Sequence, residues 1–282
     1  MEKIKQFLKR KNIEISAKRY GVDALGAMAQ GLFASLLIGT IVGTLGTQLS
    51  IEAFVTVGNF AKETHVVGAA MACAIGWALQ CPPLVLFSLI TVGAATNELG
   101  GAGGPLAVLI ITVIAAELGK AVSKETKIDI LVTPFVTIFS GSMLAVLFAP
   151  VIGSAASSLG NVIIWATDLQ PFVMGILISV LVGIALTLPI SSAAICGAFG
   201  VTGLAGGAAV AGCSAQMIGF AVMIFKENGV SGLISQGIGT SMLQMPNIVR
   251  NPRIWIPPTL ASAITGPIAT CIFKLQMNGA PV

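Results

Sequence analysis

Residues 169–225 read LQPFVMGILISVLVGIALTLPISSAAICGAFGVTGLAGGAAVAGCSAQMIGFAVMIF, and none of these 57 side chains carries a charge. Residues 130–167 form a second stretch without a charged side chain. About 20 consecutive apolar residues are enough for a helix to cross the hydrocarbon core of a bilayer. The longer stretch could therefore cross two or three times, and the chain is predicted to lie in a membrane.

The composition of the whole chain agrees with a membrane location. Charged residues make up 9% of the 282 residues, and the mean hydropathy is +0.95, whereas soluble domains have roughly 25% charged residues. The 33 glycines suit helices that pack closely in lipid or that are broken. A transmembrane β-barrel would show many alternating segments of about ten residues, and the long apolar runs argue against it. The predicted fold class is an all-α integral membrane protein with about 9–10 transmembrane helices.

The basic residues predict the orientation of the chain. Seven of the 15 Lys and Arg residues fall within the first 19 positions, and positively charged segments tend to stay on the cytoplasmic side. We therefore expect residues 1–20 to be a basic amphipathic segment on the cytoplasmic face, lying on anionic lipid rather than binding nucleic acid. Residues 21–282 are then a single polytopic membrane domain. The nine clearest crossings are predicted at 24–48, 65–82, 84–98, 105–122, 130–149, 171–188, 190–205, 208–225 and 254–274.

Two parts of the chain repeat the same plan at an offset of 107 residues. VVGAAMACAIGWALQCPP (66–83) aligns without gaps with VMGILISVLVGIALTLPI (173–190), and several glycines further on also coincide. In each copy an apolar helix ends at a proline, a short Gly-interrupted segment follows, and another apolar helix ends near a lysine. Both copies have the same predicted orientation, so we predict a parallel internal repeat over about 65–122 and 172–226.

Each copy contains a Gly-broken or re-entrant segment, at 85–105 and at 191–212. In transporters, paired segments of this kind are the best sequence indication of the binding site. Glu98 stands at the tip of the first segment, in TNELGGAGGP, and an ionisable group is costly inside a membrane domain, which makes it a functional candidate. The alternative is a solvated carboxylate at the membrane surface. The neighbours that could bind a polar solute together with Glu98 are Thr96, Asn97, Gly100 and Gly101.

Four further residues complete the predicted substrate-binding set. His65, the single histidine, begins the second crossing and is either a solute contact or an interfacial residue. Gln80 precedes the proline break of the first repeat, and Ser191 and Ser192 follow the matching break of the second. These polar groups could instead satisfy the backbone carbonyls that the prolines leave free.

Other polar residues have a structural interpretation. Glu117 lies three residues before Lys120 on one helix, which favours a local ion pair. The five cysteines lie in apolar stretches and have no metal-binding spacing, so they are predicted to be buried thiols. The sequence has no Walker A, HExxH or GxSxG motif and no paired carboxylates of a hydrolase. We therefore predict no catalytic residues, no metal site and no cofactor in this chain.

The Gly-broken segments, the TNELGG tip and the proline-terminated helices resemble the membrane-embedded IIC component of a bacterial sugar phosphotransferase system, more narrowly its perfringolysin O regulator branch. The resemblance covers nearly the whole chain. In IIC proteins of the glucose superfamily a hairpin tip reads roughly Gly-Ile-Thr-Glu-Pro, and its Glu contacts the sugar. The closest match is Thr96-Asn97-Glu98-Leu99, in which Leu99 replaces the proline. The resemblance implies a homodimer in the bacterial cell membrane that passes its sugar to a phosphorylated cytoplasmic IIB protein, a domain with no candidate in these 282 residues.

Three functions remain open at this stage. The first is an IIC-like permease subunit that binds and translocates a sugar or related polar solute by alternating access; as an enzyme it would be at most the membrane subunit of a sugar phosphotransferase. The second is an IIC-like membrane sensor or regulator without transport. The third is a channel or ion-coupled carrier for another substrate.

Overall fold

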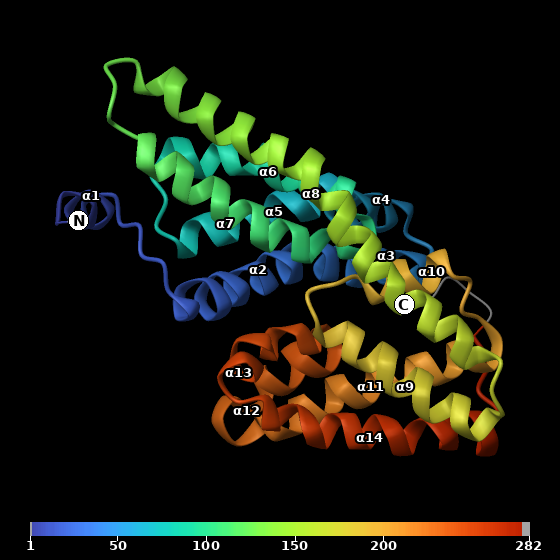
Figure 1. Ribbon diagram of the computed structural model, residues 1–282. Coiled ribbons are helices and arrows are strands. Elements are labelled where there is room, and N and C mark those ends of the chain that lie inside the picture. Colours follow the sequence, from blue (N-terminus) through green and yellow to red (C-terminus); the bar gives the residue numbers. More distant parts are fainter. Residues whose placement is uncertain (1, 278–282) are drawn as a thin grey trace. The chain divides into compact units, whose positions relative to one another are not determined.

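The structure, a computed structural model, describes residues 2–277, with side chains from Lys5 onward. Over these residues the chain is helical, and the only extended pairing is an isolated bridge between Gly203 and Met277. The all-α fold class is confirmed. The chain divides into two compact units, unit 1 through Gly153 and unit 2 from Ser154 onward, and each unit is described by itself (Figure 1).

Unit 1 is built around three neighbouring helices, α5, α6 and α7, with α2 packed against α5. Its helices are α1 (Glu2–Arg10), α2 (Leu25–Leu32), α3 (Ile38–Leu49), α4 (Glu52–Ala61), α5 (Thr64–Ala78), α6 (Pro83–Gly100), α7 (Gly104–Val122) and the first part of α8 (Asp129–Thr167). The π-helical turns η1 (Arg19–Ala24) and η2 (Phe33–Leu37) join α2 and α3 into one long helix, and the 3-10 turn η3 (Gly101–Gly103) separates α6 from α7.

Proline and glycine set the limits of the α6–α7 hairpin. Pro83 is the first residue of α6. A backbone N–H at this position would have no partner within the helix, so proline, which lacks the N–H, is tolerated there. At the other end Gly101 has φ +48°, a conformation that suits glycine and strains other residues. The predicted Gly-broken segment 85–105 is therefore regular helix as far as Gly100, and it turns only at its tip.

The helix α8 differs from its prediction. The sequence predicts a crossing at 130–149, but residues Asp129–Thr167 form one helix of 39 residues. Pro134 and Pro150 both lie inside this helix. A proline removes one backbone hydrogen bond, and membrane helices tolerate this where neighbouring groups satisfy the freed carbonyl.

Unit 2 is built around α9, α11 and α14, which pack against one another. Its helices are α9 (Pro171–Thr187), α10 (Ser192–Ala198), α11 (Gly203–Met223), α12 (Phe225–Ile234), α13 (Met245–Arg250) and α14 (Ile256–Pro267), with the π-helical turns η4 (Ser235–Gly239) and η7 (Ile268–Ile272) and the 3-10 turns η5 (Ser241–Gln244) and η6 (Pro252–Trp255). The predicted crossing at 190–205 contains only α10, whose seven residues extend about 10 Å. This segment is too short to cross a bilayer and fits the broken or re-entrant alternative.

The two predicted repeats correspond to α5–α7 and α9–α11. Both begin with an apolar helix of similar length, 15 residues in α5 and 17 in α9. The middle elements differ, because α6 has 18 residues whereas α10 has seven. Gly93 lies inside α6, but Gly200, with which it aligns, has φ +63° just beyond α10. The parallel internal repeat remains a prediction.

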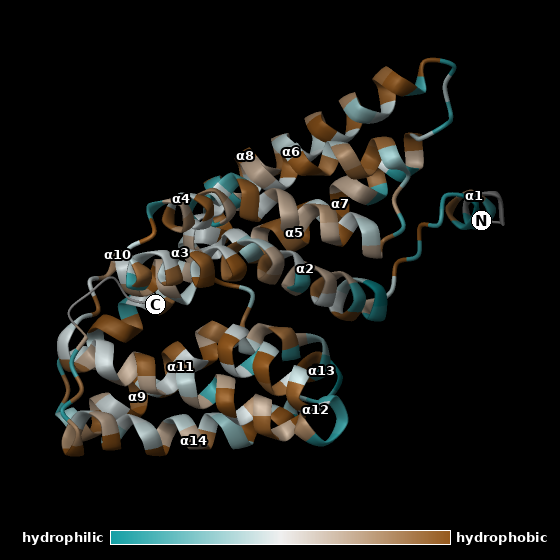
Figure 2. Ribbon diagram, turned by 180° about the vertical axis from the view of Figure 1, so that it is seen from behind, coloured by the Kyte–Doolittle hydropathy of each residue, from teal (hydrophilic) through white to brown (hydrophobic). Residues whose placement is uncertain are grey.

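Within residues 2–277, four helical stretches are long and apolar enough to cross a membrane: Arg19–Leu49, Pro83–Val122, Asp129–Thr167 and Gly203–Met223. The second of these turns at Gly101 and thus has two limbs. The apolar helices α5 and α9 are shorter. Hydrophobic residues extend along the helices of both units, with hydrophilic ones gathered mainly near helix ends and loops (Figure 2). The integral membrane class is therefore supported, whereas the count of 9–10 crossings stays a prediction.

Candidate functional site

The α6–α7 hairpin places Glu98 beside the start of α5. The Nε2 atom of His65 lies 2.7 Å from Oε2 of Glu98, and its Nδ1 atom lies 3.0 Å from Oε1 of Glu63. These three residues, the hairpin-tip cluster, come from α5, α6 and the residue that precedes α5. Their side chains are 50–58% exposed, so the cluster is open to a ligand.

The cluster can act both as a hydrogen-bond acceptor and as a donor. A neutral imidazole has one N–H group, whereas an imidazolium has two and can donate to Glu63 and Glu98 together. Each carboxylate also has an oxygen that is not the one paired with His65. Hydroxyl groups of a solute could donate to these oxygens.

Asn97 holds the hairpin tip against α5. Its side chain is 8% exposed, and its Nδ2 atom donates to the carbonyl oxygen of Thr64 at 2.9 Å. Gly104 leaves the space that Asn97 occupies, because a Cβ at position 104 would collide with the amide oxygen of Asn97. Asn97 therefore positions its neighbour Glu98 and is not itself open to solvent.

The other residues predicted at the tip differ in accessibility. Thr96 is fully buried and donates to the carbonyl oxygen of Val92 at 2.6 Å, so its hydroxyl points into the helix packing. Gly100 is buried and its backbone packs against α8 at Gly153, whereas Gly101 is exposed at the turn. Of the two glycines predicted to bind the solute, Gly100 and Gly101, only Gly101 could present its backbone to it.

The remaining predicted residues lie away from the hairpin-tip cluster or in unit 2. Gln80 follows α5, about 22 Å along the helix from His65, and its Oε1 atom accepts from Asn12 at 2.7 Å. Ser191 accepts from the backbone N–H of Ala194 and so caps α10. Ser192 is 5% exposed on the same short helix. The structure thus gives Ser191 a capping role and does not place either serine with Glu98.

A second polar group, the Lys120 cluster, lies where α5 ends. Lys120 is 1% exposed, and its ammonium group lies 2.8 Å from the carbonyl oxygen of Asn12, 3.3 Å from that of Leu79 and 2.7 Å from Oε2 of Glu117. Arg19 also donates to Leu79, at 2.8 Å. Two cations thus meet the carbonyl end of α5, where the helix dipole is negative. The predicted pairing of Glu117 with Lys120 is confirmed, but the role of Asn12 was missed.

A surface group continues this cluster toward the N-terminus. Glu125, in the loop between α7 and α8, pairs with Arg10 at 2.7 Å and also with Lys11. The hydrogen bond from Lys11, and to a smaller extent the charge of Arg10, lowers the pKa of Glu125 below its ordinary value. The side chains of Arg10 and Glu125 are 62% and 38% exposed, and exposed ion pairs contribute little to stability, so this pair has no large energetic role.

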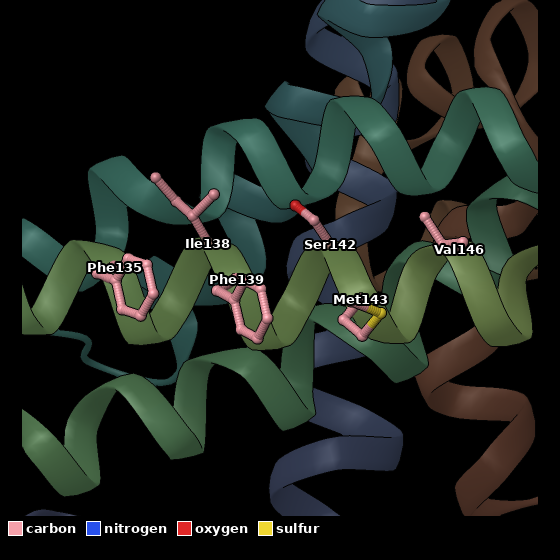
Figure 3. Close-up of a pocket in the computed structure, with 6 residues that line it drawn as sticks. All are labelled: Phe135, Ile138, Phe139, Ser142, Met143 and Val146. Carbon is pink, nitrogen blue, oxygen red and sulfur yellow. The ribbon is translucent and has the colours of Figure 1, made fainter.

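An open apolar hollow of about 390 Å³ lies on α8 (Figure 3). Its lining residues follow one face of the helix: Phe135, Ile138, Phe139, Ser142, Met143 and Val146. The rings of Phe135 and Phe139 stack with their centroids 5.5 Å apart. With a single hydroxyl and no charged group, the hollow suits lipid chains and not a polar solute.

Among the described residues, no group of three His, Cys, Asp or Glu residues could hold a metal ion.

Comparisons with known proteins identify the family. Neither the comparison with curated proteins nor that with solved structures gave a match. The family model described as the phosphotransferase system EIIC matches residues 22–282, nearly the whole chain and both units. With its apolar helices and glycine-tipped hairpin, the chain therefore belongs to the phosphotransferase system EIIC family of bacterial membrane proteins.

Proposed function

We propose that the chain is the membrane permease subunit of a sugar phosphotransferase system and binds a sugar or related polar solute at the hairpin-tip cluster. The observation that carries the proposal is the 2.7 Å contact between His65 and Glu98, two residues that are 33 positions apart. It joins the only histidine of the chain to the acidic residue of the hairpin tip. Family membership supports a sugar as the solute.

The exposed carboxylates suit a sugar because its hydroxyl groups are hydrogen-bond donors. Hydrogen bonds with an ionised partner are roughly twice as strong as those between neutral groups. Asn97 and the turn at Gly101 keep Glu98 in place next to α5. Alternating access would then bring the solute to the cytoplasmic side, where a separate IIB-type protein would phosphorylate it.

Several finer features belong to the same proposal. The protein works as a homodimer in the cytoplasmic membrane, with its N-terminus in the cytoplasm and α1 on anionic lipid. It falls in the perfringolysin O regulator branch of the family. Lys226 and Arg250 lie on exposed segments of unit 2, and the basic N-terminal segment carries further positive charge. These segments are the surfaces that a cytoplasmic partner would contact.

A sensor without transport is the second candidate. Half of the His65 side chain and more than half of the Glu98 side chain are exposed, so the cluster is not enclosed. Leu99 also replaces the proline of the sugar-binding tip motif. Uptake of radiolabelled sugar into proteoliposomes, with and without a phosphorylated IIB protein, distinguishes the two functions, because a sensor binds solute without flux.

Replacing Glu98 by glutamine should weaken solute binding at least tenfold. The change keeps the shape of the side chain and removes its charge, and a hydrogen bond to a charged group contributes about 1.5–3 kcal/mol. A loss of about 1.4 kcal/mol corresponds to one factor of ten in affinity. Calorimetry of the purified protein with glucose, mannose and mannitol would measure the effect.

The matched control for this variant is Glu52→Gln, an exposed carboxylate on α4 that is outside the cluster. Glu125→Gln is unsuitable, because Glu125 pairs with Arg10 and Lys11. His65→Gln should weaken binding as Glu98→Gln does. Equal affinities of the wild type and Glu98→Gln, or no binding of any of the three solutes by the wild type, would show that the assignment is wrong.

The proposed orientation predicts which positions reagents can reach. In a background without the five native cysteines, Lys124→Cys, Lys226→Cys and Arg250→Cys should react only with reagents that enter the cytoplasm. Cysteines placed at Glu52 and Asp168 should react from outside, because these positions lie on the opposite side in the predicted topology. Labelling of positions 124 and 226 from opposite sides of the membrane would refute the parallel repeat.

A further inference from the structure

His65 lies between two carboxylates in the hairpin-tip cluster. Its Nδ1 atom is 3.0 Å from Oε1 of Glu63, and its Nε2 atom is 2.7 Å from Oε2 of Glu98. An ionised carboxylate can only accept hydrogen bonds, and a neutral imidazole has a single N–H group, whereas the imidazolium has two. Both contacts are hydrogen bonds at the same time only when the cluster holds one further proton. Since histidine is a stronger base than glutamate, this proton belongs on His65.

The two carboxylates are the charged groups that face His65. Among the described residues they are the acids at ion-pair distance from it, and the ammonium group of the neighbouring Lys62 lies beside Gly43 on α3. The helix α2 and the turn η2 carry no ionisable side chain, and α6 carries Glu98 alone. The remaining ionisable groups of α5 and of the elements that pack against it are Glu52, which begins α4, Cys73, about two turns along α5, and a set toward Leu79 at the far end of α5: Arg19, Tyr20, Asp23, Cys81, Glu117 and Lys120. Protonation of His65 therefore depends on Glu63 and Glu98.

Loss of this proton should open the cluster. A neutral imidazole donates to one carboxylate and turns a lone pair toward the other, so one of the two contacts becomes repulsive. The two carboxylates also lose the positive charge between them, and like charges repel each other. The side chain of Glu98 should then separate from the start of α5, while the hydrogen bond from Asn97 to Thr64 holds the hairpin backbone in place.

We propose that the hairpin-tip cluster takes up a proton on His65 when it binds its solute, so that the affinity for the solute falls as the pH rises. This inference rests on the proposed function and adds Glu63 to the residues of the site. With His65 doubly protonated, Oε2 of Glu63 and Oε1 of Glu98 are held in fixed positions, where hydroxyl groups of a solute can donate to them. Fixed acceptors bind more tightly, because less freedom is lost on binding. The proton comes from bulk water, to which the His65 side chain is 50% exposed, and returns to it when the solute leaves.

The single histidine of the chain makes its protonation measurable without any solute. Protein labelled with isotope-enriched histidine, and purified through a tag without histidine, gives the ring signals of His65 alone in an NMR spectrum. His65 should lose its second ring proton at a lower pH in Glu63→Gln and in Glu98→Gln than in the wild type, because glutamine lacks the negative charge that stabilises the imidazolium. Glu52→Gln, outside the cluster, is the matched control and should titrate as the wild type does. Identical titrations of the wild type and both cluster variants would overturn the inference.

Calorimetry with glucose and mannitol over a range of pH tests the link to the solute. The affinity should be highest where His65 is doubly protonated and the carboxylates are ionised. It should fall by up to about tenfold per pH unit above the pH at which His65 titrates in the free protein, as expected for one linked proton. Within this range, buffers with different heats of ionisation should report proton uptake on binding. Glu63→Gln should move the fall to lower pH, and His65→Gln should bind more weakly, without pH dependence over the same range.

The possible outcomes separate this inference from the proposed function. Binding with constant affinity and no proton uptake across the titration range of His65 would overturn the inference and leave the solute site in place. Absence of binding of either solute at every pH would remove the solute site and the inference with it. A pH dependence that persists in folded His65→Gln, as judged by its melting temperature, would assign the proton to another group and likewise overturn the inference.

Discussion

Lys120→Met should lower the free energy of unfolding by about 3–5 kcal/mol, the usual result of removing one partner of a buried ion pair. Lys120 is 1% exposed and the side chain of Glu117 only 15%. Methionine would fill most of the volume of lysine, but it cannot donate a hydrogen bond. Among the residues that the structure describes, Lys120 is the only cation at ion-pair distance from Glu117, so the carboxylate would lose that partner, and the carbonyl of Asn12 would lose its donor.

The same change should loosen the N-terminal segment. Lys120 links α7 both to the chain at Asn12 and to the end of α5 at Leu79. Without it, the connection of Asn12 to the rest of unit 1 depends on the side-chain bonds to Gln80 and Arg19. Limited trypsin digestion should therefore cut faster within residues 9–19, and thermal melting in detergent would report the loss of stability.

Two variants complete this experiment. Lys127→Met removes an exposed lysine in the nearby loop and should change neither quantity. Lys120→Met combined with Glu117→Leu should recover part of the stability, because replacing both partners of a buried pair with apolar groups is often neutral. If Lys120→Met melts like Lys127→Met, the ammonium group has no structural role.

The sequence predicts the elements of unit 1 well because local signals define them. Hydropathy marks the helices, Pro82 and Pro83 mark the start of α6, and the glycines after Glu98 mark its end. The hairpin follows from these signals, because a chain that reverses direction at the end of α6 places the next helix, α7, beside α6. Glu98 was found because an ionisable group within an apolar domain is costly.

The contacts between distant residues could not be predicted in this way. His65 and Glu98 are 33 residues apart, and Asn12 and Lys120 are 108 residues apart. No periodicity in the sequence relates such positions, because their proximity depends on how the helices pack. The function of the buried glutamines of unit 2, Gln216, Gln236 and Gln244, could not be predicted either, because a buried amide can bridge two helices or line a site.

The continuous helix α8 and the short helix α10 show a different limit. The predicted crossing at 130–149 covers only the first part of α8, and the predicted crossing at 190–205 contains only the short helix α10. Proline allows either a break or a continuous membrane helix, depending on whether neighbouring groups satisfy the freed carbonyl. Gly200 has φ +63° and lies just beyond the end of α10, whereas Gly93, with which it aligns, lies inside the helix α6. A glycine in the sequence therefore does not by itself decide where a helix ends.

Gly68→Ala should be the second most damaging substitution, with a loss of about 3 kcal/mol in the stability of unit 1, at the upper end of the usual effect of overpacking. Gly68 lies where α5 crosses α6 at Gly93. A Cβ at position 68 would overlap the carbonyl oxygen of Gly93 and lie 2.6 Å from the Cβ of Asn97. Both obstacles are part of, or attached to, the backbone of α6, so the two helices would have to separate.

This separation should also reach the hairpin-tip cluster. Asn97 bonds to Thr64 across the same helix pair, and Glu98 is its neighbour in sequence. Moving α6 away from α5 would lengthen that bond and the contact between His65 and Glu98. Gly68→Ala should therefore lower both the melting temperature and the affinity for a sugar, although it touches neither member of that contact.

The control for this prediction is Gly43→Ala on α3. A Cβ at position 43 would meet only Gly58 Cα at 3.9 Å and Lys62 Nζ at 4.0 Å, which is ordinary contact distance. Since alanine favours a helix over glycine by about 1 kcal/mol, Gly43→Ala should leave the protein as stable or slightly more stable. The two variants make the same chemical change, so melting temperatures and calorimetric affinities can be compared directly. Equal behaviour of the pair would mean that α5 and α6 do not approach as closely at Gly68 as the structure shows.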